Sequence, residues 1–488
     1  MNTKQSLQHK NGNQHAIVIG ASMAGLLAAR VLSDHFERVT VVERDRLPES
    51  EQARKGVPQG RHIHILLNKG ASILADLFPD LFPVLAQDGA IAVDRVADTR
   101  WYHFGVWKAR FESNLKGYMQ SRPFLEWHVR DQLMKRSNVY FIEGCEVAEL
   151  CATADNSHIT GVHLRYHNPD RREEEHFADL VVDASGRGSH SPQWLTALGY
   201  GKVEESRVQV DVGYATRIYQ PPEHVSPDWK VLIVFPTPSD GKRAGAIFPI
   251  EGNRWMVTLF GWSRDYPPDD ENGFLAYARS LPMPDLYEAI KEAEPLTPIA
   301  THKYPANQRR HYERLSRFPD GFIIMGDAAC SFDPIYGQGM TAAALEASTL
   351  NTCLHQQSSA RISGNGTGLA HRFQKAIAKV LDVPWLLATN EDFRFPETQG
   401  QRPRWTGLLH WYTRRLFGLA ASDPRTTLRS YEVLNMIKPP TALFEPRILF
   451  AVLFKNQHSP AGSETTSHET ASSMVERVLA GPSSRVKE

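Results

Sequence analysis

Glycines and a carboxylate near the start of the chain have the spacing of a dinucleotide-binding turn. The segment 20–25, GASMAG, follows an apolar stretch and opens a run of helix-forming residues. Glu43 ends the next apolar stretch, close to the spacing of about 20 residues at which a carboxylate accepts ribose hydroxyls. Helix N-terminal N–H groups would face the phosphates. The candidate nucleotide-binding residues are Gly20, Ser22, Ala24, Gly25, Glu43 and Arg44.

A second loop with residues suited to binding a charged, planar group lies about 300 residues further on. The segment 326–340 reads GDAACSFDPIYGQGM and joins an apolar strand pattern to a strong helix pattern. Gly337 and Gly339 leave room for a flat ring to approach the backbone. The N–H groups of Gly339 and Met340, at the start of that helix, can stabilise negative charge.

Taken together, these motifs resemble the flavin monooxygenases of the para-hydroxybenzoate hydroxylase-type fold. Within that family they are most similar to bacterial epoxidases and hydroxylases acting on polyketide or terpenoid substrates, and the resemblance spans residues 15–455. It implies that Asp327 binds a ribityl hydroxyl of FAD and that the turn from Pro334 to Met340 lies beside the isoalloxazine ring. It also implies that Arg122 reaches the ribityl and phosphate region and that the backbone of Val147 meets adenine.

The middle motif of the family is altered in this chain. Asp183-Ala-Ser-Gly186 follows an apolar strand pattern, where many members of the family have Asp-Gly. The resemblance implies a cofactor contact for Asp183. The altered turn is similar to that of epoxidase-like and reductase branches, so a reductase or dehydrogenase of the geranylgeranyl reductase type stays open as an alternative.

The segment 54–64, RKGVPQGRHIH, resembles one that runs alongside the flavin in this branch. Gln59, His62 and His64 are therefore active-site candidates, and we single out His64 and Pro334 as catalytic. A packed, hydrogen-bonded histidine is the alternative for His64. The His-x-His spacing alone does not make a metal site because no third ligand is visible, and no metal is expected.

The pattern of expected strands and helices around these residues predicts an α/β fold. Strand, glycine turn, helix and strand over residues 15–43 form a βαβ unit with a parallel sheet. We expect a Rossmann-like FAD-binding domain of the glutathione reductase type, an inserted antiparallel-sheet substrate domain and a helical C-terminal part. The expected ranges are 1–14, a disordered N-terminus; 15–200 and 306–375, the two parts of the FAD-binding domain; 201–305, the substrate domain; 376–458, the helical part; and 459–488, a disordered tail.

Composition excludes several classes of function. Lys plus Arg and Asp plus Glu both total 55, so no positive field attracts nucleic acid. The four cysteines form no metal-binding spacing and fit a reducing cytoplasm. No apolar run is long enough to span a membrane. Peripheral membrane contact through Trp405, Trp411, Leu416 and Phe417 is a hypothesis, with core packing as its alternative, and the oligomeric state stays open.

The resemblance implies an NAD(P)H- and O2-dependent monooxygenase of secondary metabolism. NADPH or NADH would reduce FAD, and a flavin C4a-hydroperoxide would hydroxylate or epoxidise a small apolar substrate. Two further alternatives are a flavin halogenase, whose WxWxIP motif is missing, and a non-catalytic flavin-binding protein.

Overall fold

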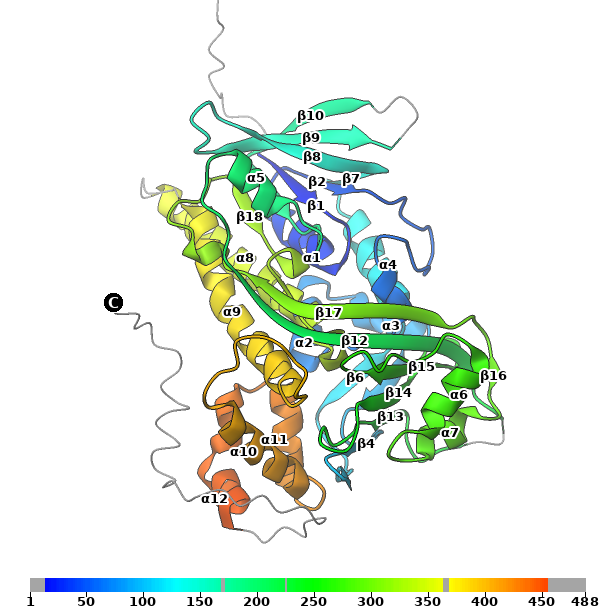
Figure 1. Cartoon of the computed structure of the whole chain (residues 1–488). Helices are drawn as coiled ribbons and strands as arrows, with labels where there is room; N and C mark the ends of the chain where they lie inside the picture. The colour runs from blue at the N-terminus through cyan, green and yellow to red at the C-terminus, as the bar shows by residue number, and fades with distance from the viewer. Residues whose placement is uncertain (1–13, 168–171, 224–225, 363–367, 455–488) are drawn as a thin grey trace, which may run out of the picture.

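The computed structural model describes residues 14–167, 172–223, 226–362 and 368–454 (Figure 1). Most of the predicted disordered N-terminus, residues 1–13, and the predicted disordered tail, residues 459–488, lie outside the described residues.

A five-stranded parallel sheet forms the centre of the half of the molecule that contains the N-terminal residues (Figure 1). Its strands are apolar along most of their length because both faces of the sheet are covered. In spatial order they are β18 Phe322–Ile324, β11 Leu180–Asp183, β1 His15–Ile19, β2 Arg38–Glu43 and β7 Val139–Glu143. The predicted βαβ unit is therefore present, with β1 and β2 paired in parallel.

Helices cover one face of this sheet and a three-stranded antiparallel sheet covers the other (Figure 1). The helices that contact its strands are α1 Met23–Leu32, α4 Arg122–Met134 and α9 Leu369–Asp392. Behind them, α8 Gly339–Ile362 packs on α1 and α9, α2 Asn68–Leu77 on α8, and α3 Leu81–Gln87 on α4. The small sheet contains β8 Cys145–Ala152, β9 Ile159–Tyr166 and β10 Glu173–Phe177. β7 and β8 join different sheets, because Gly144, at φ +69°, turns the chain between them.

A larger sheet forms the second half of the molecule, as the alternating pattern of residues 207–262 predicts. Its strands in spatial order are β19 Cys330–Ser331, β17 Ala300–Arg310, β12 Glu205–Gln220, β15 Arg254–Gly261, β14 Arg243–Ile250, β13 Val231–Val234, β4 Thr99–His103 and β5 Val106–Trp107, while β16 Glu294–Pro295 pairs with β12. All the paired strands are antiparallel except β13 and β4. The sheet therefore also takes strands from outside the predicted range 201–305.

The two faces of this sheet have different roles. One face packs against α6 Glu271–Arg279 and α7 Asp285–Ile290 in an apolar cluster. The opposite face carries Tyr214, Phe260 and other aromatic side chains, and it looks toward the loop that follows η1 Pro58–Arg61. Smaller elements complete this region: β3 Ile91–Asp94 and β6 Lys116–Met119 form a two-stranded sheet, and α5 Ser191–Ala197 follows β11.

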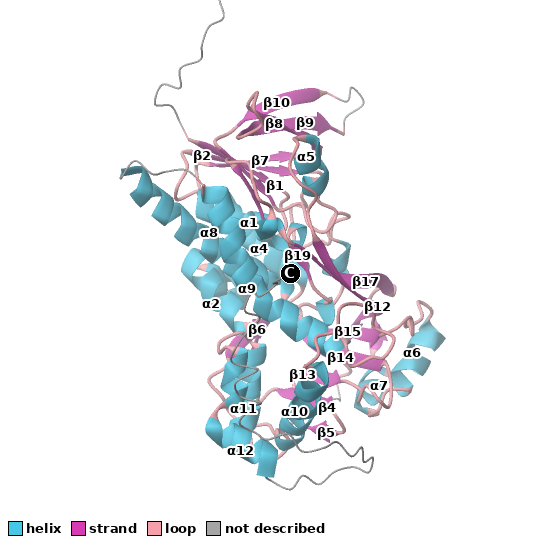
Figure 2. Cartoon of the chain, turned by 60° about the vertical axis from the view of Figure 1, so that its left-hand side comes forward, coloured by secondary structure: helices cyan, strands magenta, loops and turns pink. Residues whose placement is uncertain are grey.

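The predicted helical C-terminal part lies at one end of the molecule, beside β4 (Figures 1 and 2). It contains α10 Thr406–Leu419, α11 Pro424–Leu434, η5 Pro440–Phe444 and α12 Pro446–Phe454. Leu416 and Phe417 are buried, whereas Trp405 and Trp411 are 42% and 37% exposed. No described helix is both long and apolar enough to cross a membrane.

Candidate functional site

A cavity of about 680 Å³ lies at the carboxyl ends of the parallel strands, where the two halves of the molecule meet. Segments far apart in the sequence line it, from the turn after β1 to the start of α8. Among the predicted site residues, those that line the cavity are Gly20, Ser22, Ala24, Glu43, Arg44, Gln59, His64, Arg122, Val147, Asp327, Pro334, Gly337, Gly339 and Met340. Gly25 and Asp183 do not line it.

The turn between β1 and α1 is shaped by its two glycines. Gly20 has φ +100°, a conformation that side chains other than glycine rarely adopt. A Cβ on Gly25 would come within 1.8 Å of the Gly20 carbonyl oxygen, so only glycine fits there. The first helical hydrogen bond runs from Leu26 N to Ser22 O at 2.9 Å. The amides before Leu26 therefore have no acceptor within the helix and mark an anion site beside the cavity.

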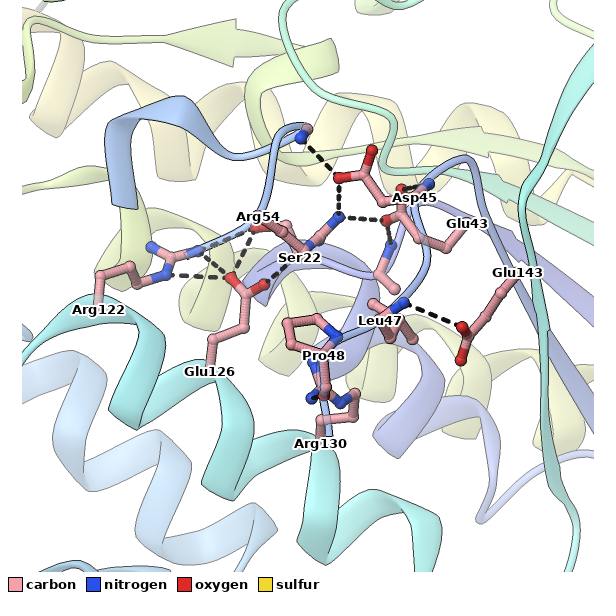
Figure 3. A network of polar contacts seen from close by, with 12 residues as sticks. Ser22, Glu43, Asp45, Leu47, Pro48, Arg54, Arg122, Glu126, Arg130 and Glu143 are labelled. Atoms are coloured by element: carbon pink, nitrogen blue, oxygen red, sulfur yellow. Dashed lines mark hydrogen bonds and ion pairs between the residues drawn. The ribbon is translucent and has the colours of Figure 1, made fainter. Parts of the chain in front are cut away.

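Glu43 lies at the centre of a polar network under this turn (Figure 3). Its carboxylate accepts a hydrogen bond from Ala21 N at 2.8 Å and pairs with the Arg54 guanidinium at 3.0 Å. Arg54 also pairs with Asp45 at 3.2 Å and with Glu126 at 3.2 Å. Its Nη2 atom is buried and has no hydrogen-bond partner among the described residues. The network therefore leaves one donor of Arg54 unpaired and sealed inside it.

Arg122 begins α4 and joins the same network. Its guanidinium donates to Ser22 Oγ at 2.9 Å and pairs with Glu126 one helical turn later, also at 2.9 Å. Burial alone would raise the pKa of Glu126, but the positive charges of Arg122 and Arg54 outweigh it and lower that pKa. Glu126 is therefore a charged carboxylate that holds two arginines at the cavity wall.

The second loop carries Asp327 and two glycines to the opposite wall. The Asp327 side chain is open to the cavity, yet the protein around the cavity removes enough water to raise its pKa, against the opposing effect of Arg187 and Arg122. Gly337 has φ +66°, and a Cβ on Gly339 would meet no atom within 4 Å. Because Gly339 borders the cavity, this open space is where a planar ring could lie against the N-terminus of α8.

A pair of buried carboxyl groups supports this loop from behind. Asp333 accepts from Tyr214 Oη at 2.7 Å, and Asp392, at the end of α9, accepts from Tyr336 Oη at 2.9 Å and from Asn307 Nδ2 at 2.6 Å. Burial raises the pKa of Asp392 well above its usual range, and the adjacent charge of Asp333 raises it further. The raised pKa favours the protonated form of Asp392, and its hydrogen bonds with Tyr336 and Asn307 tie α9 to the loop.

Asp183, the carboxylate of the middle motif, does not line the cavity. It is fully buried at the end of β11, where it accepts hydrogen bonds from Ser189 Oγ at 2.5 Å, Ser185 N at 2.8 Å and the Ser191 hydroxyl. Because its carboxylate is turned toward these serines, it shapes the loop beside the cavity. The contact between Asp183 and a cofactor stays a prediction.

A smaller apolar pocket of about 60 Å³ adjoins the large cavity. The two share a boundary that includes His64, Pro334 and Gly337. Burial lowers the pKa of His64 to about 4, helped by the charge of Arg122, so its imidazole is neutral near pH 7. The inner walls are mostly apolar and aromatic: Ile233, Phe235, Ala246, Phe248 and Phe260.

Several residues of the site were not singled out from sequence as binding residues. Glu126 had a usable signal, because it follows Arg122 by one helical turn in a segment already singled out. Asp392, Thr216 and Thr258 had none, since each meets its partner through tertiary contacts. Among the described residues, no group of three or more His, Cys, Asp or Glu side chains could hold a metal ion.

Comparison with known proteins agrees with this geometry. The chain matches the FAD binding domain family over residues 13–361. It is 34% identical over 438 residues to the protein Rv3254 of Mycobacterium tuberculosis, covering 88% of this chain and 91% of that protein. It is 25% identical over 372 residues to a kynurenine 3-monooxygenase of Salinispora tropica, covering 70% of this chain and 72% of the relative.

Two solved structures show the same fold. The flavin-dependent brominase Bmp2 superposes with a TM-score of 0.63 at 13% identity, covering 86% of this chain and 94% of Bmp2. PqsL of Pseudomonas aeruginosa, described as a probable FAD-dependent monooxygenase, superposes with a TM-score of 0.57 at 18% identity, covering 78% of this chain and 99% of PqsL. The chain belongs to the FAD binding domain family and has the para-hydroxybenzoate hydroxylase-like fold of flavin monooxygenases.

The residues around the cavity fit FAD. The start of α1 offers free amides for a pyrophosphate, Glu43 offers a carboxylate for a ribose, and the space beside Gly339 is open for a ring. The roles of the individual residues stay predictions.

Proposed function

We propose that this protein is a monooxygenase that uses FAD, NAD(P)H and O2 to hydroxylate or epoxidise a small apolar molecule. The observation that carries the proposal is the shared boundary between the large cavity and the apolar pocket at Pro334 and Gly337. A ring lying against the start of α8 would face a ligand in the apolar pocket across this boundary. The similarity to a kynurenine 3-monooxygenase supports the same class of reaction.

When bound, FAD would take electrons from NADH or NADPH and activate O2. The amides at the start of α8, next to Gly339, would stabilise negative charge on a ring placed there. The aromatic walls of the apolar pocket exclude water and orient the substrate. His64, neutral at the boundary, adds no charge to the site. The protein would therefore act by positioning and by exclusion of water.

Oxygen uptake by the purified holoprotein tests this proposal. Alkenes and aromatics are screened for stimulation of NADH or NADPH oxidation, with simultaneous measurement of O2 consumption and product mass. The expected result is a substrate that stimulates both and gains one oxygen atom. Substrate-stimulated NAD(P)H oxidation without O2 uptake would instead indicate a reductase of the geranylgeranyl reductase type.

A halogenase would give a third, distinct outcome. The fold shared with the brominase Bmp2 makes this control worthwhile, although the similarity shows the fold alone. Bromide and chloride are added to parallel reactions, and halide-dependent incorporation of a halogen into the product would contradict the monooxygenase proposal. Flavin that neither NADH nor NADPH reduces, with or without the screened substrates, would contradict any catalytic role of this kind.

A further inference from the structure

The apolar pocket contains one polar side chain whose hydrogen-bonding state the surrounding sheet fixes. His62 lies just after η1, is 5% exposed and borders the pocket. Its ring lies 5.8 Å from the rings of both Tyr214 and His302, measured between centroids. The Tyr214 hydroxyl already donates to Asp333, so it has no hydrogen left for a ligand. Gln59, His64 and His302 also border the pocket, but among the described residues only His62 has a hydrogen bond to a hydroxyl of the sheet, so its tautomer can be assigned.

Two threonines connect His62 to the sheet. His62 Nδ1 lies 2.7 Å from Thr216 Oγ1, and Thr216 Oγ1 lies 2.7 Å from Thr258 Oγ1. Thr216 on β12 is paired directly with Thr258 on β15, so the two hydroxyls meet across the strands. Both threonines are sealed from solvent, with at most 1% exposure. Nδ1 is therefore held on the sheet by a buried chain of hydroxyl groups.

The direction in which these hydroxyl groups donate follows from the contacts of Thr258. Ile63 N donates to Thr258 Oγ1 at 3.4 Å, and the only other hydrogen-bond partner of Thr258 Oγ1 among the described residues is Thr216. The Thr258 hydroxyl must donate to Thr216, because the opposite direction would leave its hydrogen without an acceptor. Thr216 then donates to His62 Nδ1. The hydrogen of the neutral imidazole consequently resides on Nε2.

The Nε2 atom of His62 has no hydrogen-bond partner among the described residues. Nε2 is not sealed by its surroundings, so it keeps some accessible surface. His62 borders the apolar pocket, so Nε2 is the atom through which it can donate to a ligand there. Burial, together with the charges of His302, His64 and Arg61, lowers the pKa of His62 to about 3. The group is thus an uncharged donor near pH 7.

We propose that His62, oriented by Thr216 and Thr258, donates a hydrogen bond from Nε2 to a carbonyl oxygen of the substrate. The substrate class is accordingly a small apolar or aromatic ketone-like molecule, with its hydrocarbon part against the aromatic wall. An uncharged N–H suits a neutral acceptor better than a carboxylate, which would favour a cation. This inference rests on the proposed function, because it specifies the ligand of the same site.

Binding of two isosteric probes to the oxidised holoprotein tests the inference. Acetophenone and α-methylstyrene have the same shape, but only acetophenone has a carbonyl oxygen. Perturbation of the flavin absorbance spectrum gives a Kd for each probe. We expect acetophenone to bind about tenfold more tightly, the effect of one hydrogen bond of about 1.4 kcal/mol. His62→Phe should remove this preference and leave the affinity for α-methylstyrene within about twofold.

Conservative variants separate hydrogen bonding from packing. His62→Gln keeps an N–H donor and should retain part of the preference for acetophenone. Thr216→Val, which keeps the shape but removes the hydroxyl, should weaken the preference about threefold, while Thr216→Ser should keep it. Equal affinities for the two probes in the wild-type protein would overturn the proposal, and so would an equal loss for both in His62→Phe. Absence of binding of both probes to the wild-type protein would also overturn it.

These measurements are independent of the oxygenation test. They use oxidised flavoprotein without NAD(P)H, so a preference for acetophenone would stand even if the protein proved to be a reductase. Conversely, oxygen insertion into a pure hydrocarbon together with equal probe affinities would leave the proposed function intact and reject the donor role of His62.

Discussion

The carboxyl group of Glu346 is fully buried inside α8, on the wall of the large cavity. It accepts a hydrogen bond from Gly326 N at 2.6 Å, and its other oxygen has no hydrogen-bond partner among the described residues. Burial raises its pKa to about 8, and the nearby charge of Asp327 adds to the effect. Glu346 is therefore protonated at neutral pH. In this neutral form the carboxyl group avoids the free-energy cost of a buried charge.

This charge state makes a prediction about pH. The unfolded carboxyl titrates near its ordinary pKa of about 4.3. Because the folded pKa is raised, the stability that Glu346 contributes is complete below about pH 4 and is lost as pH rises to about 8. Glu346→Gln is neutral at every pH, so the variant should gain stability relative to the wild type across this window. Chemical unfolding at pH 5, 7 and 9 measures the difference.

The control for this prediction is Glu112→Gln. The side chain of Glu112 is 91% exposed, so its removal should leave the pH dependence unchanged. If Glu346→Gln followed the same curve as the wild type from pH 5 to pH 9, the buried neutral state of Glu346 would be wrong.

At the scale of elements, the long helix α9 acts as a brace for the loop that contains Pro334. Asp392 at its end contacts Asn307 of β17 and Tyr336 of η4 Pro334–Tyr336. A helix, a strand of the second sheet and the cavity loop therefore meet at one buried carboxyl group. The position of this part of the loop depends on packing between elements, since η4 itself is only one short turn.

Asp392→Ala should test this brace. It would leave Tyr336 Oη and Asn307 Nδ2 buried without their partner, each at a cost of about 1–3 kcal/mol. We expect a loss of about 2–4 kcal/mol in the free energy of unfolding and a weaker affinity for FAD, because the loop loses its support. Chemical denaturation and FAD titration by flavin fluorescence measure the two effects.

Asp382→Ala is the matched control on the same helix. Its carboxylate is 58% exposed and pairs with Arg309 at 2.8 Å. Arg309 is 9% exposed but keeps its hydrogen bond to Ala378 O at 2.9 Å, so we expect a smaller loss of about 1 kcal/mol. Asp382 makes no hydrogen bond to the loop among the described residues. Comparable losses in the two variants would refute the brace.

At the scale of the whole molecule, the large cavity separates the parallel sheet from the antiparallel one. Its walls include Gly20 and Glu43 from the first half and His302 and Tyr304 from the second. A ligand that fills the cavity would thus contact both halves and stabilise the folded molecule as a unit.

Removal of FAD should therefore lower the thermal stability of the entire chain. A ligand present at about 100 times its Kd stabilises the native state by about 2.7 kcal/mol. We expect Tm to rise by a few degrees when FAD is added back to apoprotein, and to rise less with riboflavin, which lacks the pyrophosphate and adenosine. Differential scanning calorimetry checks this, and a Tm that does not respond to FAD would contradict the assignment of the cavity.

The features that depend on local backbone chemistry could be predicted from the amino-acid sequence. The turn from Gly20 to Gly25 requires glycine for a positive φ and for close approach to its own carbonyl, and both constraints act within a few residues. The strand and helix patterns around it predicted β1, α1 and β2 because apolar periodicity reflects which faces are covered. The start of α8 after Gly337 was predictable for the same reason.

Contacts between distant segments could be read only from the packed structure. The carboxylate of Asp183 faces serines that follow it, and β4 pairs with β13, which lies far along the chain. Thr216, Thr258 and His62 come from three separate segments, so no local pattern could reveal their hydrogen-bonded chain. Burial, which sets the pKa of His62 and Glu346, is likewise a property of the packed molecule.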